Sequence, residues 1–510
     1  MSARSAAPKK LVLAVIDALS PEALDEAIAD GRAPILAELV GRGDYSRDCI
    51  STFPSLTPVA ASAITTGLGP DEHLIPSMNW YHRGEERYVE YGSSFPATRA
   101  FGVFRSLQDT VYNMNLAHLT QRHRTVFEQL DDAGLRTACT TYLIYRGRFR
   151  HEPAGDSRYR RLAEAAQFRH AVWGARELFY ADLFDSRRTG CTSTLGMPGQ
   201  RDRHAGCVGS YLVEHDLFDF LLLSLPDNDS YSHKHGPDAQ PTSIAEADRA
   251  LERVVHAAGG IDDFLADHAV IVMSDHSQSL VEQPVNLAHH LGDWRVLAPS
   301  DSAPEEAELA VCPGARSAQV YALDEGRRDR MLPKLTRHLR GIEGVDLTAW
   351  LERGGAGEAP IAVVASAAAE LRFAPGDGGA RLTEDDDTMP ATDRRGASWS
   401  LAGDRSVLDL APGGDGRLVS AEYPDALGRL WSALHCPRAG DVVLSATPGY
   451  EFVDWGGSYH QAGGSHGSLH RCDSLGVLIA CGVEGRSAPV GQPHLRDVTP
   501  MIAGHFGLTS

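Results

Sequence analysis

Four short, mostly apolar runs constrain the fold more than any other feature of this sequence. They are Leu11–Ile16, Phe218–Leu225, Ala269–Met273 and Leu475–Ala480. Each is bounded by polar or glycine residues, which is typical of buried strands in a parallel sheet. Helical patterns alternate with the runs along the chain. This alternation predicts an α/β fold with a doubly wound, mostly parallel sheet that has helices on both faces, in three layers.

Two helices have clear start signals. After the first strand, Ser20 supplies an N-cap and Pro21 occupies the first helical position, so a helix is expected from there to Gly31. A second helix is expected to begin at Ser243, because Glu246 stands three residues later and completes a capping box. Each helix follows a predicted strand, as a doubly wound sheet requires.

The texture of the sequence changes between residues 354 and 440, where glycine-rich stretches and short β-type runs replace the strand–helix alternation. We interpret this segment as an insertion or cap of smaller size. The catalytic core is then expected to comprise residues 1–353 and 441–510.

Composition excludes several classes of protein. A 43% hydrophobic share over 510 residues supports a large core, and a net charge of −20 disfavours binding to nucleic acid polymers or anionic membranes. No run approaches the ~20 apolar residues of a membrane span. The eight cysteines are scattered without a CxxC motif, so reduced thiols and a cytoplasmic location are expected. The oligomeric state is not predicted.

Acidic and imidazole side chains gather directly after the predicted strands. In an open parallel sheet, ligands bind beyond the carboxyl ends of the strands. Singly, each of these residues could be a helix cap or an ordinary surface residue. Together they form a set of carboxylates that would repel one another without a cation, and six ligands suit two divalent metal ions better than one. The six are Asp17, Asp229, His233, Asp275, His276 and His466.

A hydroxyl group completes the set. Thr57 precedes Pro58 in a segment that is expected to form a helix ending at Gly67, with Thr57 as the N-cap. A helix N-terminus carries partial positive charge, which stabilises an alkoxide and an incoming phosphate. Thr57 is therefore the candidate nucleophile. Thr52, in Thr52-Phe53-Pro54, is the competing candidate.

These landmarks resemble the alkaline phosphatase superfamily, specifically its type I phosphodiesterase/nucleotide pyrophosphatase branch. The resemblance rests on motifs in family order: a strand ending in a metal-binding Asp, a nucleophilic Thr nine residues before Thr-Gly, Asp-x-x-x-His before Gly-Pro, Ser-Asp-His, and Gly-x-His-Gly. In this sequence they are Asp17, Thr57 with Thr66-Gly67, Asp229-x-x-x-His233 with Gly236-Pro237, Ser274-Asp275-His276, and His466-Gly467.

The resemblance implies two metal sites. One metal would bind to Asp229, His233 and His466. The other would bind to Asp17, Asp275, His276 and the Thr57 oxygen, and zinc is the usual metal of the family. The implied activity is metal-dependent hydrolysis of small-molecule phosphate esters, of the phosphodiesterase or nucleotide pyrophosphatase type. A phosphomonoesterase or phosphonate hydrolase on the same scaffold is the alternative, and a non-catalytic metal-binding protein is the alternative of another class.

Overall fold

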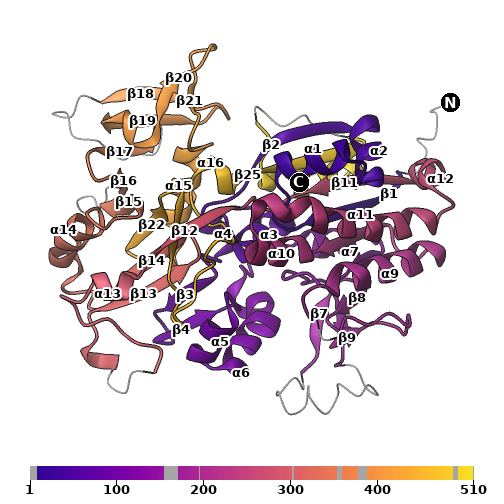
Figure 1. The fold of residues 1–510 in the computed structure, drawn as a ribbon, viewed down its shortest axis with the longest axis horizontal. Coiled ribbons are helices and arrows are strands. Elements are labelled where there is room, and N and C mark those ends of the chain that lie inside the picture. The colour runs from indigo at the N-terminus through magenta and orange to yellow at the C-terminus, as the bar shows by residue number, and fades with distance from the viewer. Residues whose placement is uncertain are drawn as a thin grey trace.

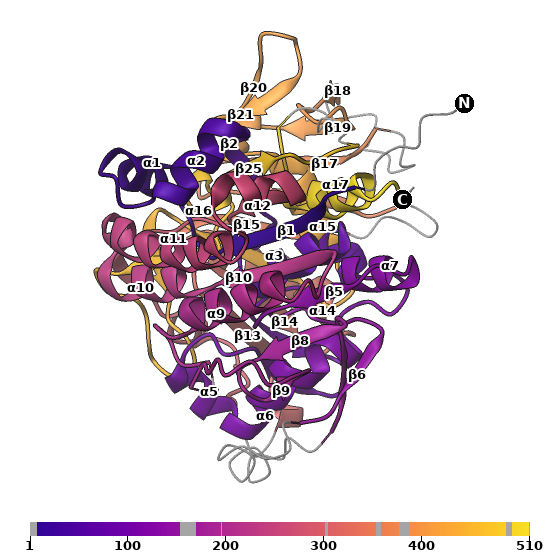
Figure 2. The same cartoon turned by 90° about the vertical axis from the view of Figure 1, so that its right-hand side faces the viewer.

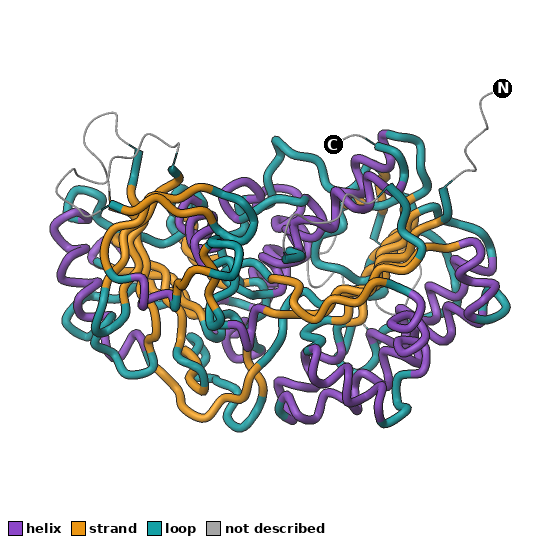
Figure 3. The backbone as a smooth tube through the Cα atoms, turned by 90° about the horizontal axis from the view of Figure 1, so that it is seen from above, coloured by secondary structure: helices purple, strands orange, loops and turns teal. Residues whose placement is uncertain are grey.

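The computed structural model describes residues 8–153, 170–194, 196–300, 304–352, 359–376, 388–485 and 492–508. The chain forms two eight-stranded sheets. The two sheets lie side by side, and we call the one that carries β1 (Lys10–Ile16) the central sheet (Figures 1 and 3). The central sheet contains all four of the apolar runs found in the sequence.

The central sheet is mostly parallel. Its strands β11, β1, β10, β5 and β8 run in one direction, and β25 lies antiparallel between β2 and β11. In spatial order the strands are β2 (Asp44–Ile50), β25 (Leu475–Cys481), β11 (His268–Met273), β1 (Lys10–Ile16), β10 (Phe220–Leu225), β5 (Thr137–Cys139), β8 (Glu177–Tyr180) and β9 (Phe184–Asp185). The prediction of a mixed α/β fold around a mostly parallel sheet is confirmed.

The direction of β25 differs from the prediction, which made all four runs parallel. The short helix α16 (Arg471–Ser474) leads straight into β25, and the loop that carries His466 precedes it. Since that loop lies at the carboxyl edge of the parallel strands, a strand leaving it must run back across the sheet. A parallel strand would need a crossover connection of a dozen or more residues.

Strand register brings the ends of β1, β10 and β11 to one edge. Ile16 pairs with Leu225 of β10, and Val15 pairs with Met273 of β11. The residues that follow these three strands therefore emerge next to one another. This edge is where the predicted site residues converge.

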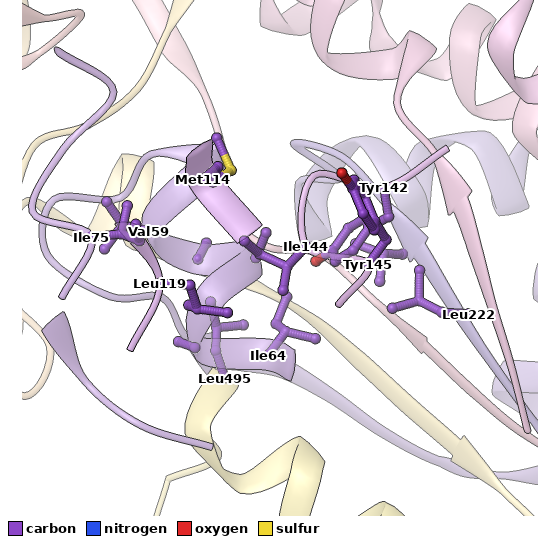
Figure 4. Packing of buried hydrophobic residues seen from close by; sticks show 14 of the residues in the cluster. Val59, Ile64, Ile75, Met114, Leu119, Tyr142, Ile144, Tyr145, Leu222 and Leu495 are labelled. Carbon is purple, nitrogen blue, oxygen red and sulfur yellow. The ribbon is translucent and has the colours of Figure 1, made fainter. Parts of the chain in front are cut away.

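Helices cover both faces of the central sheet, because the side chains of β1 alternate between two buried clusters. Figure 2 shows α9 and α11 on one side of the strands and α7 and α17 on the other. One face packs against α1 (Pro21–Ala29), α2 (Pro34–Arg42), α9 (Arg201–Glu214) and α11 (Gln240–His256), and the other against α3 (Thr57–Thr66), α7 (Val126–Asp132) and α17 (Val498–His505). Figure 4 shows part of the buried cluster on the face that packs against α3, with Val59 and Ile64 of that helix.

Of the two helix starts predicted at Ser20 and Ser243, only the first is confirmed. The side chain of Ser20 accepts a hydrogen bond from Ala23 N at 3.2 Å and caps α1 as predicted. The capping box at Ser243 is wrong, because α11 begins at Gln240. Ser243 is buried in the first turn, where its hydroxyl donates to Asn228 Oδ1 at 2.8 Å. A tertiary contact thus uses the hydroxyl that the pattern assigned to a local cap.

The second sheet is antiparallel throughout. Residues between 354 and 440 contribute four of its strands, and flanking residues contribute the other four, so the predicted insertion shares a sheet with the chain around it. Residues 353–358 and 377–387 lie outside the described part, and the domain boundaries stay a prediction. The order is β13 (Leu309–Gly314), β14 (Ser317–Ala322), β22 (Val442–Ala446), β15 (Val345–Glu352), β16 (Ile361–Ala365), β17 (Glu370–Pro375), β19 (Ser398–Gly403) and β18 (Met389–Thr392).

One disulfide links Cys191 to Cys207. The expectation that all eight cysteines are reduced is therefore wrong for this pair. The segment after β9 folds back onto α9 and brings the two Cα atoms within 5.9 Å, which cysteines spaced without a motif do not reveal. The other six cysteines are free thiols. Among the described helices, none is long and apolar enough to cross a membrane.

Candidate active site

The six predicted metal ligands lie together at the carboxyl edge of the central sheet, and we call them the strand-end centre. Asp17 follows β1, and Asp275 and His276 follow β11. Asp229 and His233 lie on α10 (Asp227–His235), which begins directly after β10. His466 comes from the loop before α16, close to the far end of the sequence.

Ligand atoms in this centre form two overlapping groups. Atoms of Asp17, Asp275 and His276 lie within 4.8 Å of one another, and so do atoms of Asp229, His276 and His466. His233 joins through Asp229, whose Oδ1 lies 3.3 Å from His233 Nε2. The spacing matches a centre in which His276 stands between two sets of ligands.

Thr57 faces the same centre. Its Oγ1 lies 3.2 Å from His276 Nε2. The predicted N-cap role is wrong, because α3 begins at Thr57 itself and Leu56 is the N-cap. The extended Leu56 leaves Thr57 as the first helical residue, while Gly67 ends the helix in the left-handed conformation, with φ 75°. The hydroxyl therefore still lies at a helix N-terminus.

The competing candidate Thr52 lies elsewhere. Its hydroxyl is buried and donates to the carbonyl of Pro54 at 3.1 Å. Thr52 is not among the residues that line the cavity over the centre, whereas Thr57 is. Between the two hydroxyl groups, the geometry favours Thr57.

The three imidazole rings are oriented by the backbone. Nδ1 of His233 hydrogen-bonds with the Gly464 carbonyl at 2.7 Å, and Nδ1 of His466 with the Ser55 carbonyl at 2.8 Å. His276 Nδ1 lies 3.2 Å from the Ser277 carbonyl. Because a carbonyl only accepts, each Nδ1 carries a proton, and the Nε2 of each neutral ring offers its lone pair. All three Nε2 atoms face the carboxylates, which is the arrangement of metal-binding histidines.

Electrostatics in the centre are unbalanced. Burial, together with the charges of Asp275 and Asp229, raises the pKa of Asp17 well above its usual value. Burial also raises the pKa of Asp275 to about 6 and lowers the pKa of His276 to about 4. The ring of His233 is the one that gains a proton readily: burial lowers its pKa, but Asp229 outweighs this and raises it to about 8. One imidazole that gains a proton readily thus lies beside three closely spaced carboxyl groups.

The residues fit divalent cations on two further counts. The Oδ1 atom of Asp17 is buried and has no hydrogen-bond partner in the structure. Carboxylate oxygen and neutral imidazole nitrogen are the donors that zinc and similar divalent ions prefer. A buried carboxylate without a partner is costly, and a bound cation removes that cost.

A cavity of about 520 Å³ opens over the centre. Its lining includes three residues that the sequence analysis did not single out as ligands or nucleophile: Arg201, Tyr142 and His460. The ring of His460 stacks on His233 with a centroid distance of 4.0 Å, and its Nδ1 pairs with Glu451 at 2.8 Å. None of these residues lies in a recognisable motif.

A family model matches most of this chain. Residues 11–366 match the family described as type I phosphodiesterase / nucleotide pyrophosphatase. This match covers more than half of the sequence and includes Asp17, Thr57, Asp229 and Asp275. Among curated proteins, no significant sequence match is found.

Solved structures of two kinds share the fold. Phosphonoacetate hydrolase from Sinorhizobium meliloti 1021 aligns with a TM-score of 0.52 and 17% identity, over 98% of this chain and 96% of its own. Murine ectonucleotide pyrophosphatase/phosphodiesterase 5 aligns with a TM-score of 0.55 and 11% identity, with the same coverage. The human form of the latter gives 0.54 and 12%.

At such identities these likenesses show the fold alone, and both neighbours have the alkaline phosphatase fold. The family itself is shown by the model match. The resemblance found in the sequence is confirmed, and the chain belongs to the type I phosphodiesterase/nucleotide pyrophosphatase family of the alkaline phosphatase superfamily.

Proposed function

We propose that the protein is a metal-dependent hydrolase of small phosphate esters, of the phosphodiesterase/nucleotide pyrophosphatase type, with Thr57 as the nucleophile. The observation that carries the proposal is the Thr57 hydroxyl at a helix N-terminus, 3.2 Å from His276 in a centre of three carboxylates and three oriented imidazoles. A phosphonate hydrolase on the same residues is the second candidate, since a phosphonoacetate hydrolase shares the fold.

Two divalent ions would occupy the centre, with zinc as the expected metal. Asp229, His233 and His466 would hold one, and Asp17, Asp275, His276 and the Thr57 oxygen the other. Bound there, the ions would supply the positive charge that lowers the pKa of the Thr57 hydroxyl and neutralises the phosphoryl oxygens. In a protein of net charge −20, such local positive charge is what allows an anionic ester to bind.

The residues of the chain then have distinct tasks. Thr57 oxygen forms a bond to phosphorus as the bond to the leaving oxygen breaks, which yields a phosphothreonine intermediate. The start of α3 places partial positive charge beside that oxygen. Hydrolysis by water regenerates Thr57 and releases phosphate or a phosphate monoester. The carbonyls of Gly464 and Ser55 keep the His233 and His466 rings in place throughout.

One relative supports the choice of residue type. A murine ectonucleotide pyrophosphatase/phosphodiesterase 5 variant with a threonine replaced by alanine is described as inactive and was solved in complex with AMP. We extend this to Thr57 because it too is a threonine. We also propose that residues 354–440 act as a cap on a three-layer core.

The test compares hydrolysis of bis(p-nitrophenyl) phosphate and p-nitrophenyl phosphate by wild type, Thr57→Ala and Thr52→Ala, with and without chelator. We expect Thr57→Ala to lower kcat by about 10³-fold or more and Thr52→Ala to leave it nearly unchanged. Chelation should abolish turnover, and mass spectrometry of the native protein should find two transition-metal ions per chain. Full activity of Thr57→Ala would move the nucleophile elsewhere.

A further inference from the structure

The cavity over the strand-end centre contains one strong cation. Among the described residues that line it, Arg201 is the single arginine or lysine. Arg201 is the first residue of α9, and 19% of its side chain is exposed. A guanidinium at the wall of a site for anionic esters calls for an account of what it binds.

One edge of the guanidinium is fixed to the segment that carries Asp229. Arg201 Nε donates to Asp227 Oδ1 at 2.8 Å, and Nη2 donates to the Pro226 carbonyl at 3.1 Å and to Ser230 Oγ at 2.7 Å. The backbone N of Arg201 donates to the other Asp227 oxygen at 3.0 Å. The plane of the fork is therefore set before any substrate arrives.

The other edge is unused. A guanidinium has five N–H donors, and Nε and Nη2 account for three of them. Nη1 makes no hydrogen bond to any residue that the structure describes. Two donors on Nη1 thus remain free on a side chain that lines the cavity.

Anchoring α9 does not explain this free edge. Helix capping by Asp227 uses the backbone N–H groups of Arg201 and Asp202, which any residue pair would supply. Arg203, two residues further along α9, does not line this cavity. Its side chain is exposed and donates to Gln200 Oε1 at 2.5 Å. It provides a matched control.

We propose that Arg201 binds a second anionic group of the substrate, so that the enzyme prefers doubly charged substrates over diesters with a single charge. This inference rests on the proposed function and names the substrate class. The two free N–H groups of Nη1 carry part of the guanidinium charge and can donate to an oxygen of a phosphate or carboxylate. The second charge can lie on the phosphoryl group itself, as in a monoester, or on an adjacent carboxylate or phosphate.

The kinetic test uses metal-loaded wild type, Arg201→Met, Arg201→Lys and Arg203→Met. Substrates are bis(p-nitrophenyl) phosphate, with one charge, and p-nitrophenyl phosphate and phosphonoacetate, with two or more. We expect Arg201→Met to lower kcat/KM for a doubly charged substrate about 30-fold, the loss of a charged hydrogen bond, and to change the diester less than about threefold. Arg201→Lys should recover part of the loss, and Arg203→Met should match wild type.

Equal losses on the singly charged and the doubly charged substrates, or no loss on the doubly charged ones, would overturn the inference. Melting temperatures separate these results from misfolding. If Arg201→Met does not fold, Arg201→Lys decides, since lysine keeps the positive charge but lacks the planar guanidinium and its hydrogen bonds.

Binding separates this inference from the proposed function. Calorimetric titration with methylphosphonate and with phosphonoacetate requires no turnover. Weaker binding of both to Arg201→Met places the arginine on the phosphoryl group, and weaker binding of phosphonoacetate alone places it on the adjacent anion. Either result supports the inference even if no ester is hydrolysed. Unchanged binding of both by a folded variant would refute it, even if the protein is an active hydrolase.

Discussion

Two sets of buried charges lie close together in this protein, and they are balanced in opposite ways. The pair Arg316–Asp473 is fully buried, with Nη1 2.7 Å from Oδ1. Arg316 also donates to the Tyr450 and Thr447 carbonyls, and Asp473 accepts from Ser468 and Ser279. The strand-end centre has three carboxylates, and among the described residues no arginine or lysine forms an ion pair with them.

The difference separates structural charge from functional charge. The Arg316–Asp473 pair braces the loop of His466, because Arg316 N donates to the His466 carbonyl at 2.8 Å and Ser468 N donates to Asp473 at 3.1 Å. The positive charge that balances Asp473 is supplied by Arg316 of the same chain. The centre lacks such compensation, and a buried charge without a partner is tolerated where an outside ion completes it.

Breaking the Arg316–Asp473 pair should have the largest effect on stability. Arg316→Met leaves Asp473 buried without its counter-charge, and we expect the free energy of unfolding to fall by about 3–5 kcal/mol. Urea denaturation at neutral pH measures this. The double variant Arg316→Met/Asp473→Leu should recover much of the loss. A single variant as stable as wild type would show that the pair is not structural.

The pH dependence of stability should have opposite signs in the two regions. In the metal-free protein, the pKa of Asp275 is raised to about 6, so its stabilising contribution is present at pH 4 and is lost as the pH rises through 6. The free energy of unfolding of Asp275→Asn is compared with that of wild type at two pH values. Between pH 4 and pH 7.5, the difference between the two proteins should shift by about 2–3 kcal/mol in favour of Asp275→Asn.

Asp473 provides the contrast. Burial acts to raise its pKa, but Arg316 and the hydrogen bonds from Ser468 and Ser279 outweigh burial and lower it. Its contribution is therefore present above the unfolded pKa of about 4 and is lost as the pH falls through the lower folded value. Asp473→Asn should destabilise the protein most at neutral pH. If both variants responded to pH with the same sign, the distinction between the two regions would fail.

Metal addition should stabilise the centre. With zinc at 100 times its dissociation constant, we expect about 2.7 kcal/mol of added stability in wild type and much less in Asp17→Asn. Thermal unfolding with and without zinc measures the shift. Arg203→Met, which alters an exposed arginine away from the cavity, should respond as wild type does. A wild type whose melting temperature ignores divalent ions would contradict the two-metal proposal.

A supporting contact should have the smallest effect. Gln278 Nε2 donates to Asp229 Oδ1 at 2.5 Å and holds that carboxylate in place. Gln278→Ala should weaken metal affinity about tenfold, as losses of such supporting hydrogen bonds do. The exposed Gln283, on β12 (Ser279–Val285), is the matched control, and Gln283→Ala should leave the affinity unchanged. Competition with a metal-binding dye gives both constants.

Local patterns predicted the strands and the edge at which the candidate ligands gather, but not everything around them. The runs that became β1, β10 and β11 are continuous apolar segments, and parallel register alone places Asp17, Asp229 and Asp275 at one edge. Because those residues directly follow strands, a fold-level rule was sufficient to bring them together.

Features that depend on distant contacts could not be predicted. The antiparallel direction of β25 follows from where the His466 loop lies, and the hydroxyl of Ser243 donates to Asn228 instead of capping α11. Arg201 joins the site only because Asp227, from another helix, holds it there. Neither residue carries a local signal of its role. The Cys191–Cys207 disulfide likewise needs the return of the chain after β9.

The place of β25 has a consequence for when the site can exist. This strand lies between β2 and β11, and the loop before it delivers His466. As a ribosome releases the chain, Asp17 leaves first, yet His466 and the strand β25 leave hundreds of residues later. Contacts between such distant segments form late in folding. A nascent chain therefore exposes its carboxylates long before it can hydrolyse anything.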